Sequence, residues 1–211
     1  MDAMTSGYRP VIAEICGLNW PGLGEADLSA VAWAYYYFSI QFRENLDVAL
    51  AIHSDDEQLK HLAREECDTD NLSPWPEVAV AGEKLNHDEF MRRVLALSPI
   101  DREVRRTIEI AGEQYLRDAR QMDDEARAMS IASYECGGLE DVFTAILRAQ
   151  QWGTPLLEGF RHFLVKHIEF DSDVMEGHGA LARHLVPDDR IRPLWTAFRD
   201  LLITAAPRLT T

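Results

Sequence analysis

Five residues scattered along the chain carry side chains that bind iron or manganese, and each falls on a predicted apolar helix face. They are Glu66, His87, Glu135, His167 and Asp171. Carboxylates can bridge two cations inside a helical bundle, while imidazoles supply terminal ligands. A buried carboxylate is costly unless it is paired or bound to a cation. Together the five residues predict an oxygen-and-nitrogen metal site in the interior.

The run from His167 to Asp171 supplies one pair of candidate ligands. At about 100° per residue the two side chains lie one turn apart on the same helix face, so they can hold one metal ion between them. His178 returns to that azimuth but lies about 16 Å further along an ideal helix. Because such ligands lie about 2 Å from a metal, His178 joins the same centre only if the helix is broken or bulged between Ser172 and Gly177.

The three earlier candidates each have a second interpretation. Glu66 continues an apolar face, but an acid at a helix end is more often solvated, and the neighbouring Glu65 competes with it for the same role. His87 precedes an apolar stripe and could equally be a core or capping histidine. Glu135 lies in the middle of an apolar stripe, where a carboxylate needs a partner. The metal site gains its support from the set rather than from any single member.

Composition restricts the class of protein. The chain has 211 residues and a net charge of −15, which argues against a nucleic-acid partner or an anionic membrane surface. No apolar run approaches the roughly 20 residues of a membrane span, and the N-terminus lacks a signal-peptide pattern. Three cysteines without close spacing argue for a reducing compartment and against a disulfide framework. We expect a cytoplasmic protein.

The hydrophobic periodicity predicts an all-α protein of about seven to eight helices in one bundle, with residues 1–211 forming a single domain and residues 1–10 a loose lead-in. A long helix is expected from Asp27 or Ser29, and Ser54 is the predicted N-cap of the next. A later helix is disturbed at Gly137-Gly138. No convincing strand pattern appears.

The order of the candidate ligands resembles that of the haem-oxygenase-like superfamily, and within it the non-haem di-iron oxidases and oxygenases. The ferritin-like pattern of two Glu-x-x-His motifs is absent. The resembling pattern is a Glu, a His soon after, a Glu on a middle helix, and a His-x3-Asp-x2-His run. This sequence matches it in order, except that Val174 stands at the last histidine, which leaves His178 as the candidate sixth ligand.

The resemblance implies an oxidase or oxygenase that uses one or two Fe²⁺ ions to activate O₂ on a small metabolite such as an amino acid, amine or fatty acid. Haem is not expected, because no histidine precedes His53. A homodimer is left open. Four aromatic residues of the long helix are candidates for the substrate pocket: Tyr35, Tyr36, Phe38 and Phe42.

Three metal-free alternatives within the same superfamily stay open. A thiaminase-II-like hydrolase would need Cys136 as its nucleophile, although the surrounding YECGG sequence lacks that family's setting. A cofactorless oxidase of the pyrroloquinoline-quinone-synthase type would use scattered polar residues. A binding or scaffold protein would retain the fold alone.

Overall fold

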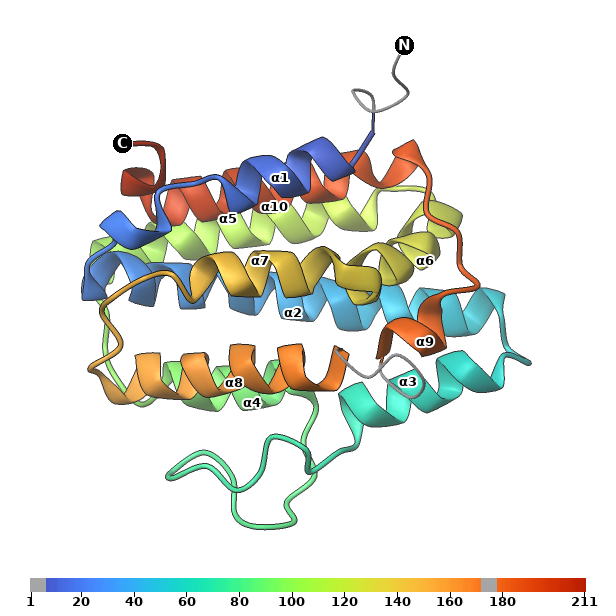
Figure 1. Ribbon diagram of the computed structural model, residues 1–211, viewed down its shortest axis with the longest axis horizontal. Helices are drawn as coiled ribbons and strands as arrows, with labels where there is room; N and C mark the ends of the chain where they lie inside the picture. Colours follow the sequence, from blue (N-terminus) through green and yellow to red (C-terminus); the bar gives the residue numbers. More distant parts are fainter. Residues whose placement is uncertain (1–6, 172–177) are drawn as a thin grey trace.

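The computed structural model describes residues 7–171 and 178–211, and in these ranges it contains helices but no strand. The predicted all-α class is confirmed. The helices pack around one hydrophobic core as a single compact domain (Figure 1). The first helix begins at Arg9, so the helical part of the chain starts within the lead-in expected over residues 1–10.

The α-helices are α1 (Arg9–Cys16), α2 (Glu25–Ile52), α3 (Glu57–Cys67), α4 (His87–Leu95), α5 (Arg102–Arg120), α6 (Asp124–Ser133), α7 (Leu139–Ile146), α8 (Pro155–Asp171), α9 (His178–Ala182) and α10 (Arg192–Ala205). Short 3-10 turns are η1 (Trp20–Gly22), η3 (Asp189–Ile191) and η4 (Pro207–Thr210), and η2 (Tyr134–Gly138) is a π-helical turn.

Helix α2 forms the centre of the bundle. It packs against α5, α6 and α10 on one side and against α3, α4 and α8 on the other (Figure 1). Its buried residues include the aromatic rings Tyr35 and Phe38, which explains why this segment is apolar around most of its circumference. Among the described residues, no helix is both long enough and apolar enough to cross a membrane.

The chain from α6 to α7 is one helical rod with an interruption in its middle. The π-helical turn Tyr134–Gly138 contains two residues with non-helical dihedral angles, Cys136 and Gly137. Gly137 has a φ of 96°, a value that glycine adopts readily and other residues avoid. The disturbance predicted at Gly137-Gly138 is therefore confirmed, and it lies next to Glu135.

Two helix starts follow local capping. Asn86 is the N-cap residue of α4. The prediction of Ser54 as the cap of α3 is wrong. The cap is Asp56, whose carboxylate accepts hydrogen bonds from the backbone N–H groups of Gln58 and Leu59. A carboxylate two residues later satisfies the same unpaired donors and is also favoured by the positive end of the helix dipole.

Candidate metal centre

Five buried side chains from five separate elements converge between α3, α4, η2, α8 and α9. They are Glu66, His87, Glu135, His167 and His178, each between 4% and 6% exposed. Helix periodicity explains why Glu66 faces inward, since it follows the buried residues Leu59 and Leu62. His87 is likewise on the buried face of α4. The structure thus brings together four of the predicted ligands and the doubtful sixth, His178.

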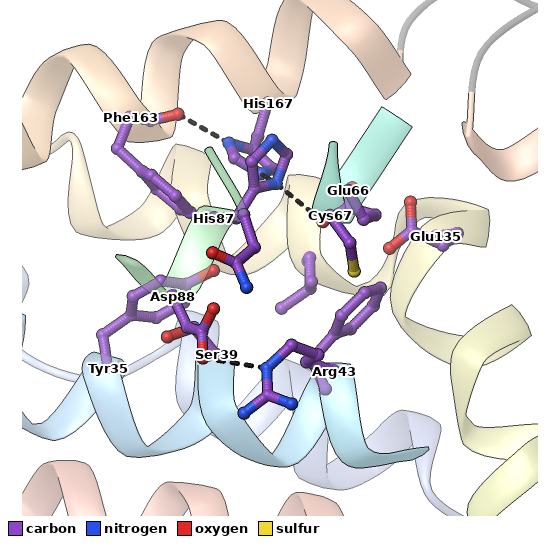
Figure 2. A pocket seen from close by; sticks show the side chains of 13 residues that line it. Tyr35, Ser39, Arg43, Glu66, Cys67, His87, Asp88, Glu135, Phe163 and His167 are labelled. Carbon is purple, nitrogen blue, oxygen red and sulfur yellow. Dashed lines mark hydrogen bonds and ion pairs between the residues drawn. The ribbon is translucent and has the colours of Figure 1, made fainter. Parts of the chain in front are cut away.

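The first group of donor atoms comprises Glu66, His87 and His167. Nδ1 of His87 lies 2.6 Å from Oε2 of Glu66 and 2.9 Å from Nε2 of His167. Three ligand atoms, one from each residue, all lie within 4.8 Å of one another (Figure 2). Two nitrogens and one carboxylate oxygen at this separation have room for one cation between them.

Neighbouring groups determine which nitrogen of each ring faces the centre. Nδ1 of His167 lies 2.8 Å from the carbonyl oxygen of Phe163, so it must be the N–H donor, and Nε2 keeps its lone pair. Asn71 donates its amide N–H to the Glu65 carbonyl, which turns its Oδ1 toward Nε2 of His87 at 3.2 Å. Nε2 of His87 is therefore a donor, and its Nδ1 faces the centre.

This pattern has a consequence for charge at the first group. With both outer nitrogens protonated, lone pairs of His87 and His167 face each other and the carboxylate of Glu66 at hydrogen-bond distance. Electron pairs this close repel unless a cation lies among them. Either a bound metal ion or an added proton resolves the conflict. Hydrogen bonds of this outer kind also orient metal-bound histidines and fix their tautomer.

The second group of donor atoms comprises Glu66, Glu135 and His178. Nδ1 of His178 lies 3.0 Å from Oε1 of Glu66 and 3.3 Å from Oε2 of Glu135. Again the three ligand atoms lie within 4.8 Å of one another. This group offers two carboxylate oxygens and one nitrogen, so it is richer in oxygen than the first.

Glu66 belongs to both groups and uses a different oxygen in each. Its Oε2 faces His87 and its Oε1 faces His178. Burial raises the pKa of Glu66, but the rings of His87 and His178, when they carry a proton, outweigh that effect and hold the pKa well below its usual range. Burial, with the adjacent His87 ring, lowers the pKa of His167 to about 3. The centre therefore holds an ionised carboxylate beside a neutral imidazole.

His178 reaches the centre from α9, whereas His167 lies on α8. The break or bulge that the sequence required for His178 to be a ligand falls between Ser172 and Gly177. Residues 172–177 and the side chain of Asp171 lie outside the described residues, and so does the predicted role of Asp171 as a ligand.

Close packing of α9 on the π-helical turn places His178 beside Glu135. A Cβ atom on Gly179 would lie 2.7 Å from the carbonyl oxygen of Glu135, so only glycine permits this approach. The thiol of Cys136 reaches the carbonyl of Gly179 at 3.5 Å. Cys136 is exposed and lines a separate surface hollow with residues of α1, away from the cavity at the metal centre.

A small cavity lies against the first group of ligands (Figure 2). The space open to the centre of a water molecule is about 20 Å³, enough for a water or an ion but not for a metabolite. Arg43 and Asp88 both line it and form an ion pair of 2.9 Å. Arg43 is the more exposed of the two, which places the pair toward the outer end of the cavity.

Of the four aromatic residues predicted for the pocket, Tyr35 and Phe42 line this cavity. The other two do not line it. Phe38 is buried in the core against Tyr134 and Phe198, and Tyr36 lines a different hollow. A single step along the helix turns a side chain by about 100°, which directs Tyr36 away from Tyr35.

The sequence interpretation missed the residues that support the ligands. Asn71 lies in a loop whose proline and polar residues indicated only irregular structure. The carbonyl of Phe163 could have been found, because it lies one turn before His167 in the same helix. Gly179 gave no sequence signal, since its importance depends on contact with a segment distant in the chain.

Comparison with known proteins adds no assignment: no family model, curated protein or solved structure matches the chain. The resemblance to the haem-oxygenase-like superfamily therefore stays a prediction, supported by the order of the candidate ligands and by the all-α fold.

Proposed function

We propose that the protein is an iron-dependent oxidase or oxygenase whose centre holds two metal ions that share Glu66. The observation that carries the proposal is the pair of buried donor groups meeting at the two oxygens of one carboxylate. Paired metals in proteins lie about 3.5–4 Å apart, a separation that a bridging carboxylate spans. The mixture of imidazole and carboxylate ligands suits iron or manganese better than softer metals.

The same arrangement is difficult to explain by structural needs alone. Two buried carboxylates in an apolar interior lose favourable hydration, and that loss has to be offset by a cation or by several hydrogen bonds. Both Glu66 and Glu135 are almost fully buried. A pair of metal ions would offset both carboxylates and would also occupy the space between the facing lone pairs of His87 and His167.

Iron bound in this centre would supply the electrons and the binding site that activate O₂. The chain's own residues would hold it in place: the Phe163 carbonyl and Asn71 keep the ring nitrogens of His167 and His87 directed at the centre. The rings of Tyr35 and Phe163 form part of the cavity wall. An apolar wall limits water, which protects a reactive centre from side reactions.

The substrate in this proposal is a small metabolite such as an amino acid, an amine or a fatty acid. The cavity is too small to admit it in the present conformation. Separation of Arg43 from Asp88 would enlarge the outer end, because this ion pair joins α2 to α4 across the cavity. The proposal also includes a cytoplasmic location, where iron(II) and reduced cofactors are accessible.

Iron loading tests this proposal. Metal-free chain is loaded with Fe²⁺ under anaerobic conditions, desalted and assayed for bound iron, and O₂ uptake is then followed on exposure to air. We expect about two iron ions per chain and O₂ consumption above that of free iron. The double variant Glu135→Ala/His167→Ala removes one ligand from each group. It should lose both the bound iron and the O₂ consumption.

The matched control is Glu140→Ala/His61→Ala, which removes the same residue types from a partly exposed position of α7 and from the exposed face of α3. It should bind iron as the wild type does. If the wild type retains no more iron than the Glu135→Ala/His167→Ala variant, the metal proposal fails. The centre would then be a protonated carboxylate–histidine cluster in a metal-free protein.

A further inference from the structure

A groove lies along α2 and the start of α5 and combines aromatic rings with arginines. Two hollows of about 560 Å³ each make up the groove, and they share Arg105 and Glu109 as lining residues. One hollow is lined by three aromatic rings of α2 together with the end of α4 and the loop that follows it, and the other is lined almost entirely by arginine side chains. We call the whole feature the aromatic–arginine groove. Its lining includes Trp33, Tyr36, Tyr37, Arg102, Arg105 and Arg106.

The aromatic half presents three rings from a single helix face. Trp33, Tyr36 and Tyr37 are at positions i, i+3 and i+4 of α2, and each is partly exposed. Partly exposed Trp and Tyr rings offer a flat apolar surface with a polar edge, and such rings are enriched where proteins bind other molecules. The indole N–H of Trp33 is occluded and has no acceptor among the residues that the structure describes.

The position of Tyr37 depends on a residue that helices normally avoid. Gly112 lies within the 19-residue helix α5, where glycine costs about 0.5–1 kcal/mol relative to alanine. A Cβ atom at this position would lie 2.3 Å from the ring of Tyr37. The glycine therefore lets the tyrosine ring pack directly on α5. Burial, together with Glu109 and Glu113, raises the pKa of Tyr37 to about 12, so its hydroxyl remains a hydrogen-bond donor at neutral pH.

The basic half carries three arginines, one of which is paired with a carboxylate. Arg105 stacks over the ring of Trp33 at 4.7 Å and pairs with Glu109 at 2.7 Å. Arg102 and Arg106, by contrast, have no ion pair within the described part of the chain. In a protein of net charge −15, two unpaired arginines at one end of an aromatic hollow favour an anionic ligand.

We propose that the aromatic–arginine groove binds a small planar aromatic molecule that carries a carboxylate or phosphate group. The ring lies against the parts of the tyrosine and tryptophan side chains that the Arg105 guanidinium leaves open, and the anionic group lies near Arg102 and Arg106. Arginine suits this role because its planar guanidinium binds carboxylate and phosphate with two parallel hydrogen bonds. Each hollow is within the size range of sites for small molecules. This site is distinct from the metal centre and does not depend on its function.

Calorimetric titration of the full chain tests both halves of the groove. The probes are adenosine 5′-monophosphate and indole-3-acetate. Each carries an aromatic ring and an anionic group, which is a phosphate in the first probe and a carboxylate in the second. Adenosine and inorganic phosphate each supply one part alone. We expect at least one of the two complete probes to bind at least tenfold more tightly than the part probes, and more weakly as salt is raised. Which complete probe binds distinguishes phosphate from carboxylate.

Two variants locate the binding. Arg102→Gln/Arg106→Gln should lower the affinity for the probe at least fivefold, because the anionic group loses its arginines. Trp33→Leu should lower the affinity by the same factor, because the ring of the probe loses an aromatic contact. The control Arg117→Gln removes an exposed arginine of the same helix outside the groove and should change nothing. NMR of the Trp33 indole N–H gives a second readout that needs no variant. No binding of either complete probe, or binding that the groove variants leave unchanged, would overturn the proposal.

Discussion

Replacing Gly179 by alanine should remove the second half of the metal centre and leave the first half intact. The added Cβ atom would lie 2.7 Å from the backbone carbonyl oxygen of Glu135, and a backbone atom cannot rotate away. Ordinary carbon–oxygen contacts are about 3.3 Å or longer. Helix α9 must therefore move by about 0.6 Å from the π-helical turn, and His178 moves with it.

This displacement is large compared with what metal coordination tolerates. Ligand distances in working sites hold to about 0.2 Å. The second group loses its nitrogen ligand, so its metal affinity should fall by about 10- to 100-fold. The first group, Glu66, His87 and His167, keeps its metal affinity. Overpacking of this kind costs about 2 kcal/mol, which lowers the melting temperature by about 4–8 °C in a chain of this size.

The assay is iron stoichiometry and thermal unfolding of Gly179→Ala beside Ala180→Gly. The control weakens the same short helix without adding an atom near Glu135. We expect about one iron per chain in the first variant and about two in the control. Two tightly bound irons in Gly179→Ala would refute the reasoning, because His178 would then reach the centre without close packing of α9.

Two further results are expected. Asn71→Leu should weaken metal binding at the first group by about 10- to 100-fold with little change at the second, since the outward N–H of His87 loses its acceptor; competition with a chelator measures this. The metal-free protein should lose stability as the pH falls from about 6.5 toward 3, because the unfolded chain protonates His167 and the folded chain does not. Below pH 4.5 the lowered pKa of Glu66 adds a loss of the same sign. Each proton taken up on unfolding changes the free energy of unfolding by at most about 1.4 kcal/mol per pH unit. Urea unfolding measures this change, and an equal free energy of unfolding at pH 7 and pH 5 would contradict the lowered pKa of His167.

The helical fold and most candidate ligands could be predicted from the sequence because they depend on local periodicity. Glu66, His87 and His167 each follow or precede apolar residues at helical spacing, so their inward direction is fixed within one or two turns. Glu135 is recognisable for the same reason, since a carboxylate inside an apolar stripe needs a partner. These side chains are buried as expected.

The remainder depends on contacts between distant segments. An ideal helix would have carried His178 about 16 Å from His167. His178 instead lies on α9, where the packing of Gly179 on Glu135 holds it beside the centre. Which of Tyr35 and Tyr36 faces the cavity likewise depends on which neighbouring helices cover each side of α2. A buried helix that is apolar all round gives no periodic signal from which that rotation can be determined.

The two halves of the candidate metal centre rest on different supports. His167 lies on the 17-residue helix α8, whereas His178 lies on α9, which is held against the π-helical turn by the close packing of Gly179 on Glu135. The second group is complete only in molecules in which α9 is docked, so its apparent affinity is the intrinsic affinity multiplied by the docked fraction. A metal ion that binds there in turn favours docking. Under the proposed function, the first ion would thus bind to a preformed site, while the second ion would complete the folding of its own site.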